Sequence, residues 1–345
     1  MRELLRKFPD RRAKRILAVD GGASKGDVAL IDTKGRVLAA VRRAGNFHFG
    51  LDHDHNSSRQ TLERTIDIVR EKAGLDHEDA VADIGVYCVA GADIPIDDRR
   101  IMTELEAMRW TSRTVVRNDT FAVLRAGTDR QWGVAVVCGT GMNWAGVGPD
   151  GRSVRFPSFG ELSGDRASGG GWLGRTALGA GIRARDGRGP RTLLEDMVPA
   201  YFDMARPTSV MEAVYVGKLQ ADRLSELAPV VFNAAAQGDV VARGMIDDMA
   251  DEIVVTVNAV IRRLHLTARD VHVVLGGSLM RAGDRKLHAR IRAGITSVAP
   301  KAVIRRLEAP PVLGAALIGL DQARAAASAR RHLRSVLTHR RLTPR

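Results

Sequence analysis

A short stretch near the start of the chain, RILAVDGGASKGDVALID at residues 15–32, limits the structures that this sequence can adopt. Two apolar runs flank a turn of small residues, and the first run ends on an acid. Such runs, separated by glycine, predict two adjacent strands. The turn carries a hydroxyl and a cation, Ser24 and Lys25. Its glycines let backbone N–H groups approach an anion closely, because no Cβ intervenes.

A similar hairpin returns in WGVAVVCGTGMNWAGVG, residues 132–148. An offset of 116 residues places Ser24 on Thr140, and Gly35-Arg36 on Gly151-Arg152. Each turn then offers one hydroxyl that can donate a hydrogen bond to a phosphate oxygen. The repeat predicts two similar lobes holding one polyphosphate, although two ordinary hairpins would give the same pattern. The P-loop and the strand-to-helix G-x-G-x-x-G signatures are absent from the sequence.

The remaining chain alternates apolar runs with stretches of helical periodicity, which predicts an α/β fold without a long linker. Residues 171–267 are expected to be mostly helical, with the longest helix at 238–266. Outside the two hairpins we expect strands at 81–91, 111–119, 271–278 and 302–307, and helices at 53–73, 98–109 and 311–327.

Composition narrows the classes of function. A length of 345 residues allows two ordinary domains, and an aromatic content of 4% argues against base-stacking platforms. The two cysteines, Cys88 and Cys138, lie in apolar runs and suit a reducing compartment. No apolar run is long enough to suggest a membrane span, and the charged N-terminus lacks a signal-peptide pattern. We therefore expect a cytoplasmic protein that does not insert into a membrane.

The net charge of +13 is concentrated at the two ends of the chain. Residues 1–15 contribute +5 and residues 322–345 contribute +7, so the body is nearly neutral. We expect solvated basic tails at 1–14 and 328–345. Binding of nucleic acid or an acidic partner by these tails stays open, but it is not favoured because the body shows no pattern for sequence readout.

Three motifs resemble those of the superfamily of acetate and sugar kinases, actin and heat-shock chaperones. VDGGASKGDVALID resembles its first phosphate motif, CGTGMNWAGVGPDGR its second, and VHVVLGGSLM its adenosine motif. Within that superfamily the chain is similar to the eukaryotic-type N-acetylglucosamine kinases, grouped with the BadF/BadG-type ATPases. The stretches AGNFHF, RNDTFAVLRAGT and FGELSGDRASGGGWLG carry this likeness, which spans residues 15–327.

The resemblance implies two actin-like, ribonuclease H-like lobes with a nucleotide cleft between them. The lobes are expected at 15–128 and, with a helical insertion, at 129–310; a C-terminal helix at 311–327 would pack back on the first lobe. The implied cofactors are ATP and Mg²⁺. The implied reaction transfers the γ-phosphoryl group of ATP to a hydroxyl of an amino sugar, N-acetylglucosamine or glucosamine-like, or of a hexose. Whether the chain forms a homodimer stays open.

The resemblance also implies roles for individual residues. Asp119 matches the general base, and Asp20 matches the acid that holds magnesium, usually through water. The implied nucleotide contacts are Gly22, Ser24, Lys25, Gly139, Thr140 and Gly141 for the phosphates, and Gly276 and Gly277 for adenosine. The implied sugar contacts are Asn46, Asp119, Asn143, Phe159, Gly160 and Asp165.

Most of these residues have an ordinary structural alternative. Asp119 could cap the helix that follows it, and Asp20 could be a turn acid. Asp165 could form an Asx turn. Asn46 could be a turn residue, and Asn143 could simply close its hairpin.

The chain departs from the family in the loop where sugar is expected. It reads Gly164-Asp165-Arg166-Ala167-Ser168, followed by three glycines, where the family often reads Gly-Asp-Glu-Gly-Ser. A cation replaces an acid, and the added glycine loosens the loop. The identity of the sugar therefore stays open.

A second function and a metal site are the alternatives to this interpretation. Relatives that activate 2-hydroxyacyl-CoA dehydratases are ATPases with an iron–sulfur cluster between two subunits and no sugar acceptor. Only Cys88 and Cys138 could hold such a cluster, and both fit a core role better. His48, His53 and His55 alternate with acids at 52 and 54, but a solvated helix start explains them without a metal.

Overall fold

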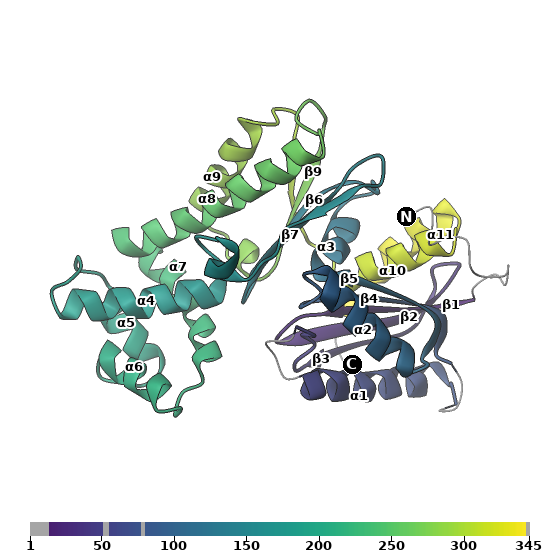
Figure 1. The fold of residues 1–345 in the computed structure, drawn as a ribbon, viewed down its shortest axis with the longest axis horizontal. Helices are drawn as coiled ribbons and strands as arrows, with labels where there is room; N and C mark the ends of the chain where they lie inside the picture. The colour runs from purple at the N-terminus through teal and green to yellow at the C-terminus, as the bar shows by residue number, and fades with distance from the viewer. Residues whose placement is uncertain (1–13, 51–54, 77–79, 343–345) are drawn as a thin grey trace. The chain divides into compact units, whose positions relative to one another are not determined.

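The structure is a computed structural model that describes residues 14–50, 55–76 and 80–342. Two five-stranded sheets organise the chain, with the strand orders β3-β2-β1-β4-β5 and β10-β9-β6-β7-β8 (Figure 1). Helices accompany both sheets, which confirms the α/β prediction. Among the described residues, no helix combines the length and apolar character needed to cross a membrane.

The first sheet is a meander extended by two parallel strands. β1 pairs antiparallel with β2, and β2 with β3, whereas β4 and β5 follow β1 in parallel. Its three central strands, β1, β2 and β4, are nearly continuous buried runs, as expected where both faces of a sheet are covered. The strands are β1 (Arg15–Gly21), β2 (Lys25–Asp32), β3 (Val37–Ala44), β4 (Ala82–Val89) and β5 (Thr111–Asn118), and the helices are α1 (His55–Ala73), α2 (Pro95–Ala107) and α3 (Asp119–Gly127).

The second sheet carries most of the remaining helices. Its strands are β6 (Gly133–Cys138), β7 (Met142–Val147), β8 (Ser153–Arg155), β9 (His272–Gly276) and β10 (Val303–Arg306). A helical region lies between β8 and β9, as the sequence predicts. It comprises η2 (Gly160–Ser163), α4 (Gly170–Arg185), α5 (Leu194–Tyr201), α6 (Pro207–Tyr215), η3 (Ala221–Leu227), α7 (Ala228–Ala236) and α8 (Val240–Arg263); η4 (Leu279–Arg281) and α9 (Arg285–Thr296) follow β9.

The two sheets repeat one topology. Read from β8, the second sheet has the order β8-β7-β6-β9-β10, which matches β3-β2-β1-β4-β5 strand for strand. We call residues 32–36, which connect β2 to β3, and residues 148–152, which connect β7 to β8, the distal turns. In both, the N–H of the first residue donates to the carbonyl of the fifth, at 3.0 and 2.8 Å. The fourth residue is Gly35 or Gly151, with φ of +83° or +82°. The offset of 116 residues is therefore a repeat in structure.

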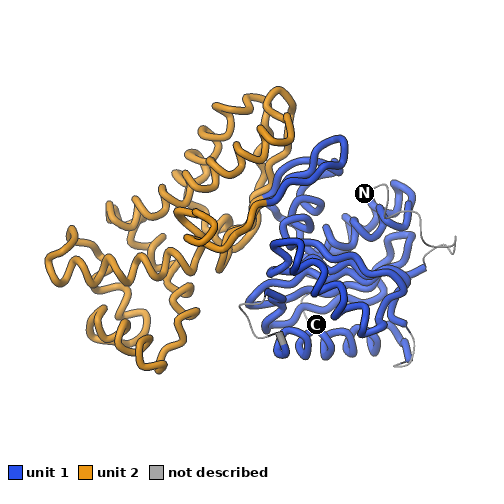
Figure 2. The backbone as a smooth tube through the Cα atoms, viewed as in Figure 1, with its two compact units in different colours: residues 1–135, 145–155, 307–345 blue, residues 136–144, 156–306 orange. Residues whose placement is uncertain are grey.

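The chain divides into two compact units (Figure 2). Unit 1 comprises residues 1–135, 145–155 and 307–345, and unit 2 comprises 136–144 and 156–306. In unit 1, α10 (Val312–Gln322) packs against β1 and α3. A Cβ at Gly314 would overlap the backbone of Ala122, so glycine is required where α10 meets α3.

The C-terminal segment differs from the solvated tail that the sequence predicts from residue 328. It forms α11 (Ala327–Val336) and α12 (His339–Leu342). Leu333, Leu337 and Leu342 are buried, so these helices belong to the packed part of unit 1. The arginines between these leucines hid the apolar spacing from an interpretation based on net charge. The N-terminal tail lies outside the described residues up to residue 13.

Candidate functional site

The carboxyl ends of three parallel strands place polar residues in one row of unit 1. Asp20 of β1 lies in register with Cys88 of β4, and Cys88 lies in register with Arg117 of β5. In open α/β sheets, ligands bind beyond the carboxyl ends of parallel strands. This edge is therefore the first part of the candidate site.

Asp119 is the first residue of α3 and follows β5 directly. The helix is capped by Asn118, whose Oδ1 accepts a hydrogen bond from the Thr120 N–H at 3.0 Å. The Asn118 side-chain nitrogen donates to Asp93 Oδ1 at 2.8 Å. Asn118 therefore occupies the N-cap position that the capping alternative gave to Asp119, and Asp119 is the first residue of the helix, where its carboxylate meets backbone N–H groups.

The electrostatics of Asp119 suit proton transfer near neutral pH. Burial raises the pKa of Asp119 to about 7, and the charge of Asp93 adds to this effect. Backbone N–H groups at the start of α3 act in the opposite direction. A carboxylate whose pKa lies near the working pH can accept a proton during a reaction and release it afterwards.

The Asp20 carboxyl group lies near two other acids, Asp27 and Asp119, whose charges act on it. Burial, followed by the charges of Asp27 and Asp119, raises the pKa of Asp20 well above its ordinary value. Asp27 is itself neutralised by Arg42 through hydrogen bonds of 2.6 and 2.7 Å. Among the described residues no group of three or more ligating side chains gathers. Mg²⁺ commonly takes one or two carboxylates and completes its shell with water and phosphate oxygens, and a role of Asp20 as such a ligand stays a prediction.

The first glycine turn, residues 21–25, is held by the loop that follows β3. The Gly22 carbonyl accepts from the Phe47 N–H at 3.0 Å, and a Cβ at Gly26 would lie 2.6 Å from the Phe47 ring. Ser24 and Lys25 are exposed, so both can reach a ligand. The turn is therefore fixed in its backbone while its polar side chains stay accessible.

The second glycine turn, residues 139–141, is held by a helix terminus. The Gly170 and Gly171 N–H groups, at the start of α4, donate to the carbonyls of Gly139 and Thr140, each at 2.8 Å. Thr140 and Gly141 are exposed. Two donors at this helix start are thus already used for packing, and the exposed Thr140 hydroxyl is the group left for a ligand.

The Gly-Gly turn after β9 packs against the second turn. Gly276 ends β9, and Gly277 has a φ of +94°. A Cβ at Gly277 would overlap the backbone of Cys138, immediately before Gly139. Unit 2 therefore brings together the second glycine turn and the turn predicted to contact adenosine.

The loop predicted to contact sugar is anchored to α8. Asp165 is buried, and its Oδ2 accepts from the Ser163 hydroxyl at 2.6 Å. The Arg166 N–H donates to Glu252 Oε2 at 3.3 Å. Burial, with a contribution from the charge of Asp165, raises the pKa of Glu252. Phe159 and Gly160 open this loop, and Phe159 is exposed.

Both asparagines with predicted sugar contacts make local hydrogen bonds. Asn46 Oδ1 accepts from the His48 N–H at 2.9 Å, which is the geometry of a turn residue. Asn143 Oδ1 accepts from the Trp144 N–H at 2.8 Å. These bonds match the structural alternatives, and contact with sugar stays a prediction for both.

The cysteines and histidines supply no further site among the described residues. Cys88 and Cys138 are fully buried, and burial raises the pKa of Cys138 to about 12 and that of Cys88 still further. This supports the core interpretation of both thiols. His48 Nδ1 accepts from the Gly50 N–H at 3.0 Å. His53 lies outside the described residues, as does the side chain of His55.

Sequence reasoning missed two acids that act on the candidate site. Asp93 holds Asn118 and raises the pKa of Asp119, and Glu252 holds the Arg166 backbone. Asp93 carried a signal, since it follows closely after the strand at 81–91 and so belongs to the same sheet edge as Asp119. No feature of the sequence marked Glu252, because an acid within a long helix is usually solvent-exposed.

The duplicated sheets, the glycine turns and the acids at the sheet edge define an α/β protein with the actin-like ATPase fold. The sequence model of the BadF/BadG/BcrA/BcrD ATPase family matches residues 17–319, and the chain belongs to this family. A curated relative, the N-acetylmuramic acid/N-acetylglucosamine kinase of Clostridium acetobutylicum, is 24% identical over 312 residues, which cover 90% of this chain and 99% of the relative. The N-acetyl-D-glucosamine kinase of Dictyostelium discoideum is 25% identical over 314 residues, covering 88% and 97%.

Solved structures share the fold. A candidate N-acetylglucosamine kinase from Chromobacterium violaceum aligns with a TM-score of 0.68 at 23% identity, covering 91% of this chain and all of that one. A ROK family glucokinase from Streptomyces griseus, solved with glucose and AMPPNP, aligns with a TM-score of 0.55 at 16% identity, covering 89% and 99%.

Proposed function

We propose that this protein is an ATP-dependent sugar kinase that transfers the γ-phosphoryl group of ATP to a hydroxyl of an amino sugar or hexose. The observation that carries the proposal is Asp119, a carboxylate at a strand end with a pKa of about 7. Family membership supports the use of ATP. The names of the two curated relatives support an amino sugar as the acceptor.

Asp119 acts as the general base. The sugar oxygen forms a bond to the γ-phosphorus as the bond from that phosphorus to the β–γ bridging oxygen breaks, and the hydroxyl proton passes to Asp119. Phosphoryl transfer needs this positioning and charge neutralisation more than covalent help. Asn118 and Asp93 hold the start of α3 and so fix where the Asp119 carboxylate stands.

The glycine turns bind the phosphates of ATP. Ser24, Lys25 and Thr140 supply exposed hydroxyl groups and one cation, and the turn backbones supply N–H donors without an intervening Cβ. Gly276 and Gly277 supply the adenosine turn. Asp20 would hold Mg²⁺, which would supply positive charge to neutralise the phosphates.

The sugar contacts assigned to this reaction are Asn46, Asn143, Asp165 and the start of the loop at Phe159 and Gly160. The exposed Arg166, where the family often has an acid, adds a cation next to Asp165 in this loop. A substrate with a carboxylate, such as N-acetylmuramic acid, would be favoured by this charge. The relative from Clostridium acetobutylicum is named for both N-acetylmuramic acid and N-acetylglucosamine.

We propose that the reaction takes place in the cytoplasm, which contains ATP and is reducing enough to keep the two cysteines as free thiols. A homodimer remains part of the proposal. The alternative, an ATPase that activates a partner protein through an iron–sulfur cluster, is not favoured because both thiols are fully buried.

ADP release tests the proposal. ATP and Mg²⁺ are supplied with no sugar, or with N-acetylglucosamine, N-acetylmuramic acid, glucosamine or glucose in turn. A sugar kinase releases ADP at least about tenfold faster with its acceptor, since an acceptor hydroxyl held in place outcompetes water. Release at one rate in every reaction would contradict the proposal and support the switch ATPase.

A further inference from the structure

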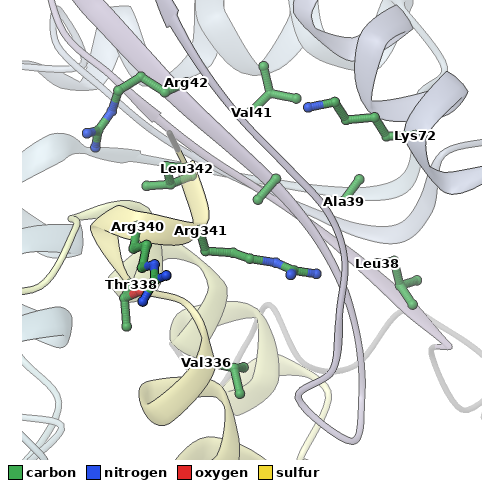
Figure 3. Close-up of a pocket in the computed structure, with 11 residues that line it drawn as sticks. Leu38, Ala39, Val41, Arg42, Lys72, Val336, Thr338, Arg340, Arg341 and Leu342 are labelled. Atoms are coloured by element: carbon green, nitrogen blue, oxygen red, sulfur yellow. The ribbon is translucent and has the colours of Figure 1, made fainter. Parts of the chain in front are cut away.

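A groove of about 750 Å³ lies in unit 1, between the edge strand β3 and the C-terminal segment. Residues 38–42 of β3 form one wall, and Val336, Thr338 and residues 340–342 form the other. Lys72, in the last turn of α1, completes the lining. Figure 3 shows Lys72 and Arg341 approaching β3 from these two different segments. The volume falls in the range of small-molecule sites.

The groove has a one-sided charge. Lys72, Arg340 and Arg341 contribute three cations, and none of its described lining residues is acidic. Arg42 also lines the groove, but its guanidinium is held by Asp27, and its Nη2 lies 3.3 Å from Nδ1 of His339. Among the described residues, no ion pair joins Lys72, Arg340 or Arg341 to an acid. The groove therefore suits an anion.

The rest of the lining is apolar. Leu38, Ala39 and Val41 come from β3, and Val336 and Leu342 from the C-terminal segment. An inorganic ion would leave these side chains without a contact, whereas an organic body attached to the anion would cover them. Two arginines and a lysine together favour a doubly charged group such as a phosphate, which arginine binds through paired hydrogen bonds.

The C-terminal wall of the groove is rigidly attached. Arg334 of α11 donates to the carbonyls of Ala126, Arg125 and Thr128, at the end of α3, at distances of 2.7, 2.9 and 2.6 Å. Leu333 and Leu337 are buried beside it. The C-terminal wall also lies beyond residue 319, where the match to the family ends, and no residue of the two glycine turns lines the groove.

We propose that this groove is a second binding site, for a small organic molecule that carries a phosphate group. The three cations bind the phosphate, and the apolar residues of β3 and the C-terminal segment contact its organic body. The second site is not part of the proposed kinase reaction. Its test measures binding alone, so the result does not depend on whether the protein is a kinase.

Phenyl phosphate is the probe, because it joins a phosphate to a small apolar body. Its binding to the full chain is followed by calorimetry at low salt and by the methyl NMR signals of Ala39 and Ala40, which report on the groove itself. We expect saturable shifts of both signals, weakened by salt, with inorganic phosphate binding more weakly and neutral phenol not binding. Absence of saturable shifts, or equal binding of phosphate and phenyl phosphate, would overturn the proposal.

The variants isolate the lining cations. The double substitution Arg340→Gln and Arg341→Gln, and separately Lys72→Gln, should each weaken phenyl phosphate binding at least about tenfold, the scale of one lost charge-assisted hydrogen bond. Arg331→Gln is the matched control, because Arg331 is an exposed residue of α11 outside the groove. Equal weakening in the control would show non-specific attraction to a basic surface and overturn the site.

Discussion

The β1–β2 and β6–β7 hairpins share a scaffold but differ at the ends where ligands are expected. Their distal turns, 32–36 and 148–152, have the same hydrogen bonds and the same glycine conformation. The glycine turns at the other ends have diverged. Residues 21–25 lie among the acids Asp20 and Asp27, whereas residues 139–141 are packed against the start of α4 and against Gly277. The distal turns are thus alike in both hairpins. The glycine turns differ: residues 21–25 lie in a charged environment, whereas residues 139–141 pack against neighbouring backbone.

The largest expected effect tests where the chemistry lies. Asp119→Asn should reduce kcat by about two or more orders of magnitude, the usual scale for a general base, while ATP still binds. Turnover and nucleotide binding are measured on the same preparation. Asp129→Asn is the matched control, since Asp129 is an exposed acid that follows α3. Near-normal turnover of the Asp119→Asn variant would show that Asp119, between β5 and α3, is not the general base.

The second prediction sets the two turns against each other. A Cβ at Gly277 overlaps the Cys138 backbone, and the residue has a positive φ. Gly277→Ala should therefore lower the free energy of unfolding by about 2–4 kcal/mol. A Cβ at Gly22 meets only the Lys25 carbonyl, at an ordinary 3.6 Å. The Gly22→Ala variant should keep the stability of the unsubstituted protein but raise the KM for ATP, because in the proposed site the new methyl group would face the phosphates.

Denaturant unfolding and ATP kinetics on both variants check this contrast. The same loss of stability in both, or the same change in KM in both, would mean that the two turns do not divide the roles.

The pH dependence follows from the environment of Asp119. As the proposed base, Asp119 would work in its ionised form, and burial raises its pKa to about 7. The kcat/KM for the sugar should therefore fall about tenfold between the plateau above neutrality and about pH 6. A profile of initial rates at saturating ATP measures this. A plateau that extends unchanged down to about pH 5 would show that the titrating group is a different one or that Asp119 has an ordinary pKa.

The smallest expected effect concerns the C-terminal helices. The Arg334 guanidinium donates hydrogen bonds to three backbone carbonyls at the end of α3. Arg334→Met should therefore destabilise the protein by about 1–3 kcal/mol, and Arg334→Lys should recover part of this loss. Thermal or denaturant unfolding provides the measurement, with Arg331→Met as the exposed control on the same helix. Equal stability of all three variants would mean that α11 does not support α3.

Much of the fold was predictable from the sequence because its signals were local. The glycine turns, the apolar strands and the offset of 116 residues predicted the hairpins, and the long helix at 238–266 appears as α8, Val240–Arg263. The C-terminal helices were missed because charge was considered without periodicity: seven arginines after residue 321 outweighed the spacing of Leu333 and Leu337.

The candidate site was predictable only in part. Acids at strand ends marked Asp20 and Asp119, because parallel strands bring their carboxyl ends to one edge. The capping role of Asn118 and the contact of Glu252 with the Arg166 backbone depend on three-dimensional packing. No short-range pattern distinguishes Asn118 from Asp119 as the cap, since both residue types are good caps.

The central claim is that ATP passes its γ-phosphoryl group to a sugar. The most direct measurement is ³¹P NMR of the full chain with ATP, Mg²⁺ and N-acetylglucosamine or N-acetylmuramic acid. The account predicts a new phosphomonoester signal that grows in step with ADP, and its absence in Asp119→Asn. Growth of inorganic phosphate in step with ADP, without a phosphomonoester from any sugar supplied, would contradict it.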